Sequence, residues 1–244
     1  MAMLKSKKRR IGLPVLAAVL LALVLGCGAY VGDYYRAGEE TMVHSETVTV
    51  EITETRAVFT PEEPKAGLIF YPGGKVEFTA YAPLMATLAE RDILCVLVKM
   101  PFNLAVLDVN AAEGIREQFP EVERWYLAGH SLGGSMAASC AASHAEAFEG
   151  LILLAAYSTA DLTETGLKVL SLYGDRDGVL DMEKYEVYRA NFPEDAVETV
   201  IEGGNHAQFG SYGPQDGDGE AAISRQEQLD ITVEAVLALV ESGE

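Results

Sequence analysis

The chain has 244 residues, of which 49% are hydrophobic and 23% charged, a composition typical of folded globular proteins that argues against intrinsic disorder. Its formal net charge is −19, yet the first ten residues hold five of the eighteen basic side chains and no acidic one. The rest of the chain therefore has thirteen basic and thirty-seven acidic residues, a balance of −24. Such a charge repels phosphate backbones, so we expect no nucleic-acid partner. These numbers predict no oligomeric state.

The N-terminal segment is predicted to anchor the chain in a membrane. Residues 1–10 form a basic tail, and residues 11–31 are twenty-one residues without a charged side chain. A helix of that length can cross a hydrocarbon layer of about 30 Å. Basic residues ahead of it favour a cytoplasmic N-terminus. We therefore expect a single-pass protein of the cell membrane, with everything after Gly32 outside the cytoplasm.

Two other interpretations of this segment stay open. Val24-Leu25-Gly26-Cys27 resembles a bacterial lipoprotein cleavage box, which would leave Cys27 lipidated as the new N-terminus. A cleaved secretory signal would release the domain instead, although no clean small-x-small cleavage site follows. All three interpretations place the rest of the chain outside the cytoplasm.

After a polar connector at residues 32–45, residues 46–244 are predicted to form one domain of the α/β class. Residues 47–59 alternate between apolar and polar side chains, which indicates a hairpin of two strands. Short apolar runs then alternate with helix-like stretches, a pattern typical of a mostly parallel sheet covered by helices on both faces. The predicted strands are residues 67–71, 93–98, 125–128, 151–155, 169–173 and 197–201, and the predicted helices are residues 79–91, 103–118, 132–147, 181–191 and 223–241.

The segment Gly129-His130-Ser131-Leu132-Gly133 follows a predicted strand and precedes an alanine-rich helix. A G-x-S-x-G turn between a strand and a helix holds its serine on a strained backbone, so both glycines are expected to have a steric purpose. The turn also places the hydroxyl at a helix N-terminus, where backbone N–H groups favour developing negative charge. Ser131 is therefore the predicted nucleophile.

Candidates for an acid and a base follow this serine along the chain. Hydrolases with this turn order their catalytic triad as serine, acid and histidine. His206 is the one histidine after the candidate acids, and it comes soon after the last predicted strand. The loop after the strand at 169–173 supplies two carboxylates, Asp175 and Asp177. We favour Asp177, because loops of the form Gly-x-x-Asp carry the acid in many such hydrolases. Asp175 is the alternative, and one of the two could merely pair with Arg176.

An oxyanion hole for acyl transfer needs two backbone N–H donors. Leu132, the residue after the nucleophile, is predicted to supply the first. The second is expected from the glycine-rich loop that follows the first parallel strand. Gly74 is favoured in that loop, with Gly73 and Lys75 as alternatives.

Longer stretches of the chain add a resemblance to these motifs. They are Ile69-Phe70-Tyr71-Pro72-Gly73-Gly74-Lys75-Val76-Glu77, Ala80-Tyr81-Ala82-Pro83-Leu84 and Val98-Lys99-Met100-Pro101-Phe102-Asn103-Leu104-Ala105, together with the serine, acid and histidine motifs. Through them, most of residues 45–242 resembles a compact α/β-hydrolase family akin to the dienelactone hydrolases, whose members often carry an N-terminal membrane segment. The resemblance implies an α/β-hydrolase fold and a triad of Ser131, Asp177 and His206. Dienelactone hydrolases use a cysteine nucleophile, so this serine leaves a lactone substrate in doubt.

The motifs together predict a serine hydrolase that cleaves carboxylic esters through an acyl-enzyme, without a metal or organic cofactor. Residues 157–167 are too few to form a cap domain, which favours small-molecule substrates with small or exposed acyl groups. A peptidase or thioesterase with the same triad is an alternative. A non-catalytic binding protein on a hydrolase scaffold is another, because a fold alone does not assign a function.

Metal and disulfide sites have little support in the sequence. No spacing of cysteine and histidine indicates a zinc site, and the Asp-Gly-Asp-Gly run at residues 216–219 lacks the spacing of an EF-hand. Cys95 and Cys140 lie in apolar or alanine-rich stretches and are expected to be buried and unpaired.

Overall fold

The computed structural model describes residues 12–41 and 45–242, and the chain divides into two units at Tyr34 and Tyr35. The first unit contains α1 (Gly12–Gly32). Among the described residues, α1 is the one helix long and apolar enough to cross a membrane, a property that signal sequences share. The predicted apolar segment is thus helical from residue 12, while residue 11 and the predicted basic tail at 1–10 lie outside the described residues.

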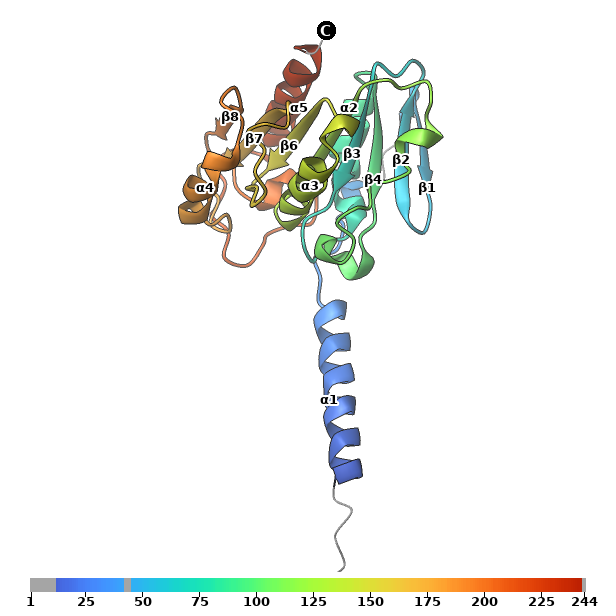
Figure 1. Ribbon diagram of the computed structural model, residues 1–244, viewed down its shortest axis with the longest axis vertical. Coiled ribbons are helices and arrows are strands. Elements are labelled where there is room, and N and C mark those ends of the chain that lie inside the picture. The colour runs from blue at the N-terminus through green and yellow to red at the C-terminus, as the bar shows by residue number, and fades with distance from the viewer. Residues whose placement is uncertain (1–11, 42–44, 243–244) are drawn as a thin grey trace, which may run out of the picture. The chain divides into compact units, whose positions relative to one another are not determined.

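The second unit is built on a mostly parallel sheet, which has eight strands in the described part of the chain (Figure 1). The strands are β1 (Val48–Ile52), β2 (Arg56–Pro61), β3 (Ala66–Tyr71), β4 (Ile93–Val98), β5 (Trp125–His130), β6 (Gly150–Leu154), β7 (Lys168–Gly174) and β8 (Val197–Ile201). Their order across the sheet is β1-β2-β4-β3-β5-β6-β7-β8. β2 pairs antiparallel with β1 and with β4, and all pairs from β4 to β8 are parallel. The predicted hairpin and the predicted parallel strands are confirmed.

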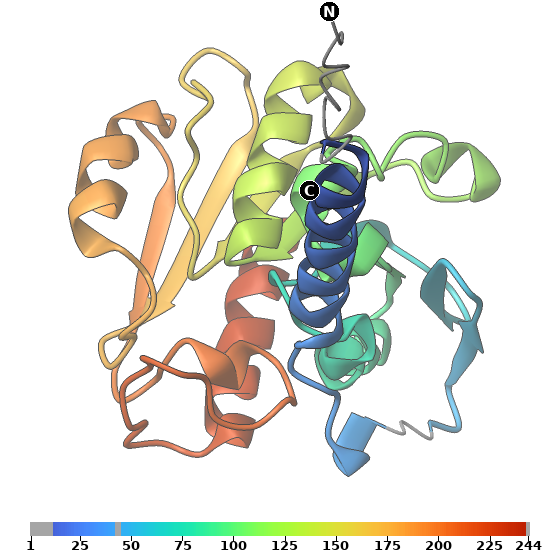
Figure 2. The ribbon, with the colours of Figure 1, turned by 90° about the horizontal axis from the view of Figure 1, so that it is seen from below.

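Helices cover both faces of this sheet, as predicted. The helices of the domain are α2 (Ala82–Ala89), α3 (Leu132–Ser143), α4 (Met182–Tyr188) and α5 (Arg225–Glu241). α2 and α5 pack on one face, and α3 and α4 pack on the other, as Figures 1 and 2 show from two directions. Each face has its own buried apolar core.

The central strands are apolar throughout because both of their faces are buried. In β3, Leu68 and Phe70 join the core under α2 and α5, whereas Ile69 and Tyr71 join the core under α3 and α4. This alternation is the two-residue period of a strand. The continuous apolar runs in the sequence therefore indicate strands of a sheet that is covered on both faces.

One predicted helix is wrong. Residues 103–118 form no α-helix and belong to an irregular excursion, residues 99–118, which begins directly after β4 and contains short 3-10 turns. Phe102 and Asn103 at its start have φ angles of 54° and 56°, in the left-handed region, which interrupts a right-handed helix. Tertiary hydrogen bonds hold the excursion instead: the hydroxyl of Tyr71 donates to the carbonyl of Val109 (3.0 Å) and accepts from the N–H of Ala112 (2.8 Å).

The predicted connector contacts the domain before the first strand. The N–H of Tyr35 donates to the carbonyl of Lys75 (2.8 Å), and the N–H of Glu77 donates to the carbonyl of Tyr35 (2.8 Å). These bonds form a short parallel bridge between Tyr35 and Val76. The chain therefore attaches to the loop between β3 and α2, in which the oxyanion donor Gly74 is predicted.

Gly67 in β3 allows the only tryptophan of the chain, Trp125, to lie against the strand. A Cβ at Gly67 would come within 2.5 Å of the indole ring, and the ring is held by a hydrogen bond from its Nε1 to the carbonyl of Val122 (2.9 Å). We expect Gly67→Ala to lower the free energy of unfolding by about 1–3 kcal/mol through overpacking. Denaturant unfolding followed by the fluorescence of Trp125 measures this change.

Gly38→Ala is the matched control, because a Cβ there meets its nearest neighbour at 3.4 Å, an ordinary contact distance. Its effect should stay within about 0.5 kcal/mol. Equal stabilities of the two variants would contradict this account of the β3–β5 packing.

Candidate active site

Each residue predicted for the site follows the carboxyl end of a parallel strand. Gly74 follows β3, Ser131 follows β5, Asp177 follows β7 and His206 follows β8. The strands end in register, since Tyr71 pairs with Gly129, and further along the sheet Gly174 pairs with Ile201. Loops at the carboxyl ends of parallel strands meet at one edge of the sheet, where ligands of α/β proteins bind.

Ser131 lies on a sharp turn between β5 and α3. Its φ of 53° and ψ of −125° are unusual for a residue with a side chain, and its N–H donates to the carbonyl of Leu154 in β6 (2.9 Å). The flanking glycines are required sterically, as predicted. A Cβ at Gly129 would lie 2.6 Å from the carbonyl carbon of Gly133, and a Cβ at Gly133 would lie 2.2 Å from the carbonyl oxygen of Pro72.

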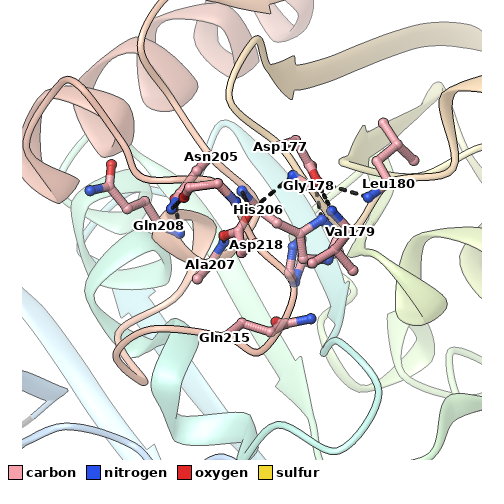
Figure 3. Close-up of polar contacts among 12 residues, drawn as sticks. Asp177, Gly178, Val179, Leu180, Asn205, His206, Ala207, Gln208, Gln215 and Asp218 are labelled. Atoms are coloured by element: carbon pink, nitrogen blue, oxygen red, sulfur yellow. Dashed lines mark hydrogen bonds and ion pairs between the residues drawn. The ribbon is translucent and has the colours of Figure 1, made fainter.

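His206 and Asp177 form a buried pair. Nδ1 of His206 lies 2.8 Å from Oδ2 of Asp177, and the two side chains are 2% and 1% exposed. The other oxygen of Asp177 accepts hydrogen bonds from the N–H groups of Val179 (2.8 Å) and Leu180 (2.7 Å) (Figure 3). The carboxylate is therefore fixed by its own loop while it accepts from the imidazole, which fixes the ring orientation.

The alternative acid, Asp175, is placed elsewhere. It is exposed, and its Oδ1 accepts a hydrogen bond from the N–H of Gly203 (2.7 Å) and lies 3.7 Å from Nε of Arg176. The structure thus brings Asp177, and not Asp175, to His206. Asp175 is therefore the carboxylate that pairs with Arg176, as was expected for one of the two.

The second ring nitrogen of His206, Nε2, is buried and has no hydrogen-bond partner among the described residues. No hydrogen bond joins it to Ser131 in this structure. Hydrogen bonds between a nucleophile and its base are often long without substrate and tighten when substrate binds. An unpaired nitrogen in a buried position is unfavourable unless the site supplies a partner during its function.

Three N–H groups in the glycine-rich loop after β3 are engaged. Gly73 donates to the hydroxyl of Tyr81 (3.1 Å), Lys75 donates to the carbonyl of Asn103 (2.7 Å), and Val76 donates to Gly73 (3.3 Å). The N–H of Gly74 has no acceptor among the described residues.

The same holds for the N–H of Leu132, the first residue of α3. Gly74 also lies against Leu132, since a Cβ on Gly74 would come within 2.9 Å of the Leu132 side chain. The two predicted donors are thus neighbours with free N–H groups. The engaged N–H groups of Gly73 and Lys75 argue against those two alternatives.

His130, the variable residue of the serine turn, connects this loop to the base. Its ring packs on His206 with centroids 4.5 Å apart, and its Nδ1 lies 2.7 Å from the hydroxyl of Tyr81. Because that hydroxyl already accepts from Gly73, its own proton can point to Nδ1 of a neutral His130. Burial, together with the neighbouring His206, holds the pKa of His130 well below its usual value. His130 therefore stays neutral beside the candidate base.

Asp218 was not among the predicted site residues, yet it holds two loops of the site together. Its Oδ1 accepts from the N–H of His206 (3.2 Å) and of Gly178 (3.1 Å), and its Oδ2 accepts from the N–H of Ala207 (2.8 Å) (Figure 3). The carboxylate thus joins the loop of the acid to the loop of the base. Its signal in the sequence is the glycine-flanked run at 216–219, in a polar loop that the sequence predicts near the rim of the active site.

Gln228 of α5 holds the backbone just before His206. Its buried side chain accepts from the N–H of Asn205 (3.0 Å) and donates to the carbonyl of Asn205 (2.8 Å). Both backbone groups of the residue before His206 are therefore satisfied by one amide side chain. This arrangement positions the backbone that carries His206.

A hollow of about 880 Å³ adjoins the loop after His206. It is lined by Asn205, Gln208 and Pro214 together with Glu39 and Arg225, among others, and Ser131 is not among its lining residues. Among the described residues, no group of three or more His, Cys, Asp or Glu side chains could hold a metal ion.

Comparisons with known proteins indicate the family to which the fold belongs. Residues 67–230 match the model of the alpha/beta hydrolase family. A comparison with curated protein sequences gives no match.

Several solved structures are similar to the chain at low sequence identity. TT1662 from Thermus thermophilus is 19% identical with a TM-score of 0.56, over 80% of this chain and 98% of that one. Est1E from Butyrivibrio proteoclasticus is 14% identical with a TM-score of 0.56, over 80% and 100%. The thermophilic esterase Est2 from Thermogutta terrifontis is 15% identical with a TM-score of 0.51, over 80% and 93%.

At these identities the similar structures show the fold alone. The family model is more direct, because it covers more than half of the chain. This chain therefore belongs to the alpha/beta hydrolase family.

Proposed function

We propose that the chain is a serine esterase whose triad consists of Ser131, His206 and Asp177. Ser131 is the nucleophile, His206 the general base, and Asp177 the group that orients the imidazole and stabilises its protonated form. The N–H groups of Gly74 and Leu132 form the oxyanion hole. The proposal includes no metal or organic cofactor.

The observation that carries this proposal is the buried pair of His206 and Asp177. An Nδ1–Oδ2 distance of 2.8 Å orients the ring, and the opposite nitrogen is left buried without a partner. With Nδ1 paired to the carboxylate, Nε2 is the nitrogen available to accept the proton of a nucleophile. The strained turn at Ser131 is the second support, because strain concentrates at functional sites.

The reaction follows from these positions. His206 takes the hydroxyl proton of Ser131 as the oxygen attacks the ester carbonyl, and the tetrahedral oxyanion accepts hydrogen bonds from Gly74 and Leu132. The imidazolium then gives its proton to the leaving alcohol, which leaves an acyl group on Ser131. Water, deprotonated by His206, attacks the acyl carbon, and the imidazolium returns the proton to Oγ of Ser131 as the bond between Oγ and the acyl carbon breaks and the carboxylic acid is released.

The proposed substrate is an ester with a small or exposed acyl group. Residues 157–167, between β6 and β7, form a short irregular connection rather than a lid. One of the similar structures, Est2 from Thermogutta terrifontis, is described as an esterase, which favours esters over amides or thioesters. Another, Est1E, is described with ferulic acid bound, a statement about that protein. Peptidase or thioesterase activity with the same triad is the second candidate.

We further propose that α1 anchors the enzyme in the cell membrane, with the domain outside the cytoplasm. The five basic residues ahead of the helix support this orientation. A lipoprotein with lipidated Cys27, or a secreted enzyme, are the alternatives. The mass of the mature chain separates the three, since only the anchor keeps residues 1–26.

A fluorophosphonate probe tests whether Ser131 is a nucleophile. The purified chain should become labelled, because His206 activates the hydroxyl, and Ser131→Ala should not. Ser135, one turn further along α3, is the matched control, since its hydroxyl already donates to the carbonyl of Tyr157 (2.8 Å). Ser135→Ala should label normally. An unlabelled wild-type chain would support the alternative of a non-catalytic binding protein.

Substitution of each aspartate by asparagine, one at a time, tests which of the two is the acid of the triad. Asp177→Asn should lower kcat on the order of 10³–10⁴-fold, because an amide cannot hold the required tautomer of His206. Asp175→Asn should change kcat less than about threefold, because the amide oxygen can still accept from Gly203. Steady-state hydrolysis of an activated ester measures both. Larger loss in Asp175→Asn than in Asp177→Asn would reverse the assignment.

Soluble esters of rising acyl length, with matched amides and thioesters, test the substrate class. Short acyl esters should give the highest kcat/KM, because no lid shelters a long chain. A preference for long acyl chains in solution would contradict the inference from the short β6–β7 connection. Faster cleavage of the thioesters or amides would favour the second candidate.

A further inference from the structure

Three large apolar side chains are exposed on the excursion after β4. Phe102, Val106 and Leu107 are 63%, 54% and 55% exposed, and we call them the apolar patch. Single exposed apolar residues are common on proteins, whereas exposed apolar residues that cluster indicate an interaction surface. The excursion follows the carboxyl end of β4, at the same sheet edge as the active site.

The apolar patch is fixed to the oxyanion loop. The carbonyl of Asn103 accepts from the N–H of Lys75 (2.7 Å), and Ala105 is buried in the core under α3. Tyr71, at the end of β3, holds the excursion further along through Val109. The patch is thus presented by a well-bonded segment, and not by a loose loop.

Charge around the patch differs from that of the whole chain. Residues 99–107 contain one basic residue, Lys99, and no acidic one, although the chain has thirty-seven acidic residues. This segment therefore brings no acidic side chain of its own to an interface with a negative surface potential. The composition suits the zone between lipid headgroups and acyl chains, which receives apolar side chains.

Chain connectivity brings the same loop near any membrane that α1 spans. Only Asp33 and Tyr34 separate Gly32, the last residue of α1, from Tyr35, which is hydrogen-bonded to Lys75 and Glu77. Three residue steps span at most about 10 Å. That limit holds for every direction the helix could take, so a bilayer crossed by α1 has its surface close to this loop.

We propose that the apolar patch inserts into the surface of the bilayer in which the chain is anchored, so that the active site takes esters presented by that lipid surface. The substrate part rests on the proposed function. A small or exposed acyl group would then enter the uncapped site while the remainder of the molecule stays in the lipid. The apolar patch thus contacts the lipid surface, and it does not bind the acyl chain of a dissolved substrate.

The first test measures contact with lipid and needs no activity. The full chain with Cys27→Ala is reconstituted in phosphatidylcholine vesicles and labelled with an environment-sensitive fluorophore at Leu107→Cys. The matched control carries the label at Val187→Cys on α4, where an apolar side chain is 70% exposed at the other end of the sheet. Cys95 and Cys140 are buried and should not react.

Nitroxide-labelled lipids should quench the fluorophore at position 107 at least about threefold more than at position 187, because only the first enters the interface. Equal quenching at both positions would overturn the proposal. This readout remains valid even if the chain proves to have no esterase activity.

The second test measures the substrate. Val106→Ser with Leu107→Ser should lower hydrolysis of a bilayer-embedded ester about fivefold or more, and leave a short soluble ester within about twofold. Val187→Ser with Val197→Ser, two exposed positions on α4 and β8, should change neither. Equal loss on both esters would make the patch a wall of the substrate site and overturn the proposal, as would no loss on either. No hydrolysis of the soluble ester by the unmutated chain would contradict the proposed function itself.

Discussion

The close packing of Gly133 against the carbonyl groups of Tyr71 and Pro72 is the constraint on which the site depends. A Cβ at Gly133 would lie 2.2 Å from one of these oxygens, so only glycine permits the contact. The contact brings the start of α3 against the loop after β3 and places the free N–H groups of Leu132 and Gly74 side by side. The strained backbone of Ser131 is held between these elements, and its N–H is fixed by β6.

The loops that carry Asp177 and His206, the acid and base of the site, are positioned by polar groups. Asp218 satisfies backbone N–H groups from two loops, and Gln228 satisfies both backbone groups of Asn205. His206 and Asp177 are then free to pair with each other at 2.8 Å. Since buried polar groups are unfavourable without partners, these hydrogen bonds hold the two loops, and with them the side chains of His206 and Asp177, in place.

The strands and the serine turn could be predicted well from the sequence, because each depends on a short stretch of neighbouring residues. Six apolar runs gave the parallel strands to within a few residues, and the G-x-S-x-G turn identified its own glycines as sterically required. The choice between Asp175 and Asp177 could not be made locally, because it depends on where a loop meets His206, twenty-nine residues after Asp177.

Contacts between distant residues explain what the sequence did not predict. The bond between Tyr81 and His130 joins residues forty-nine apart, and Asp218 acts on two loops that precede it. The helix expected at 103–118 failed for a related reason: its composition allows a helix, but the hydrogen bonds of Tyr71 and Lys75 hold it in another path.

The central claim is that an acyl group passes through Ser131, and trapping that intermediate tests it most directly. The chain is mixed with an activated ester, quenched in acid within milliseconds to seconds, digested and analysed by mass spectrometry. The account predicts the acyl mass on the peptide that contains Ser131, with fragment ions assigning it to that hydroxyl and hydroxylamine removing it. An acyl group on another side chain, or turnover of the ester with no acylated peptide at any time, would contradict the account.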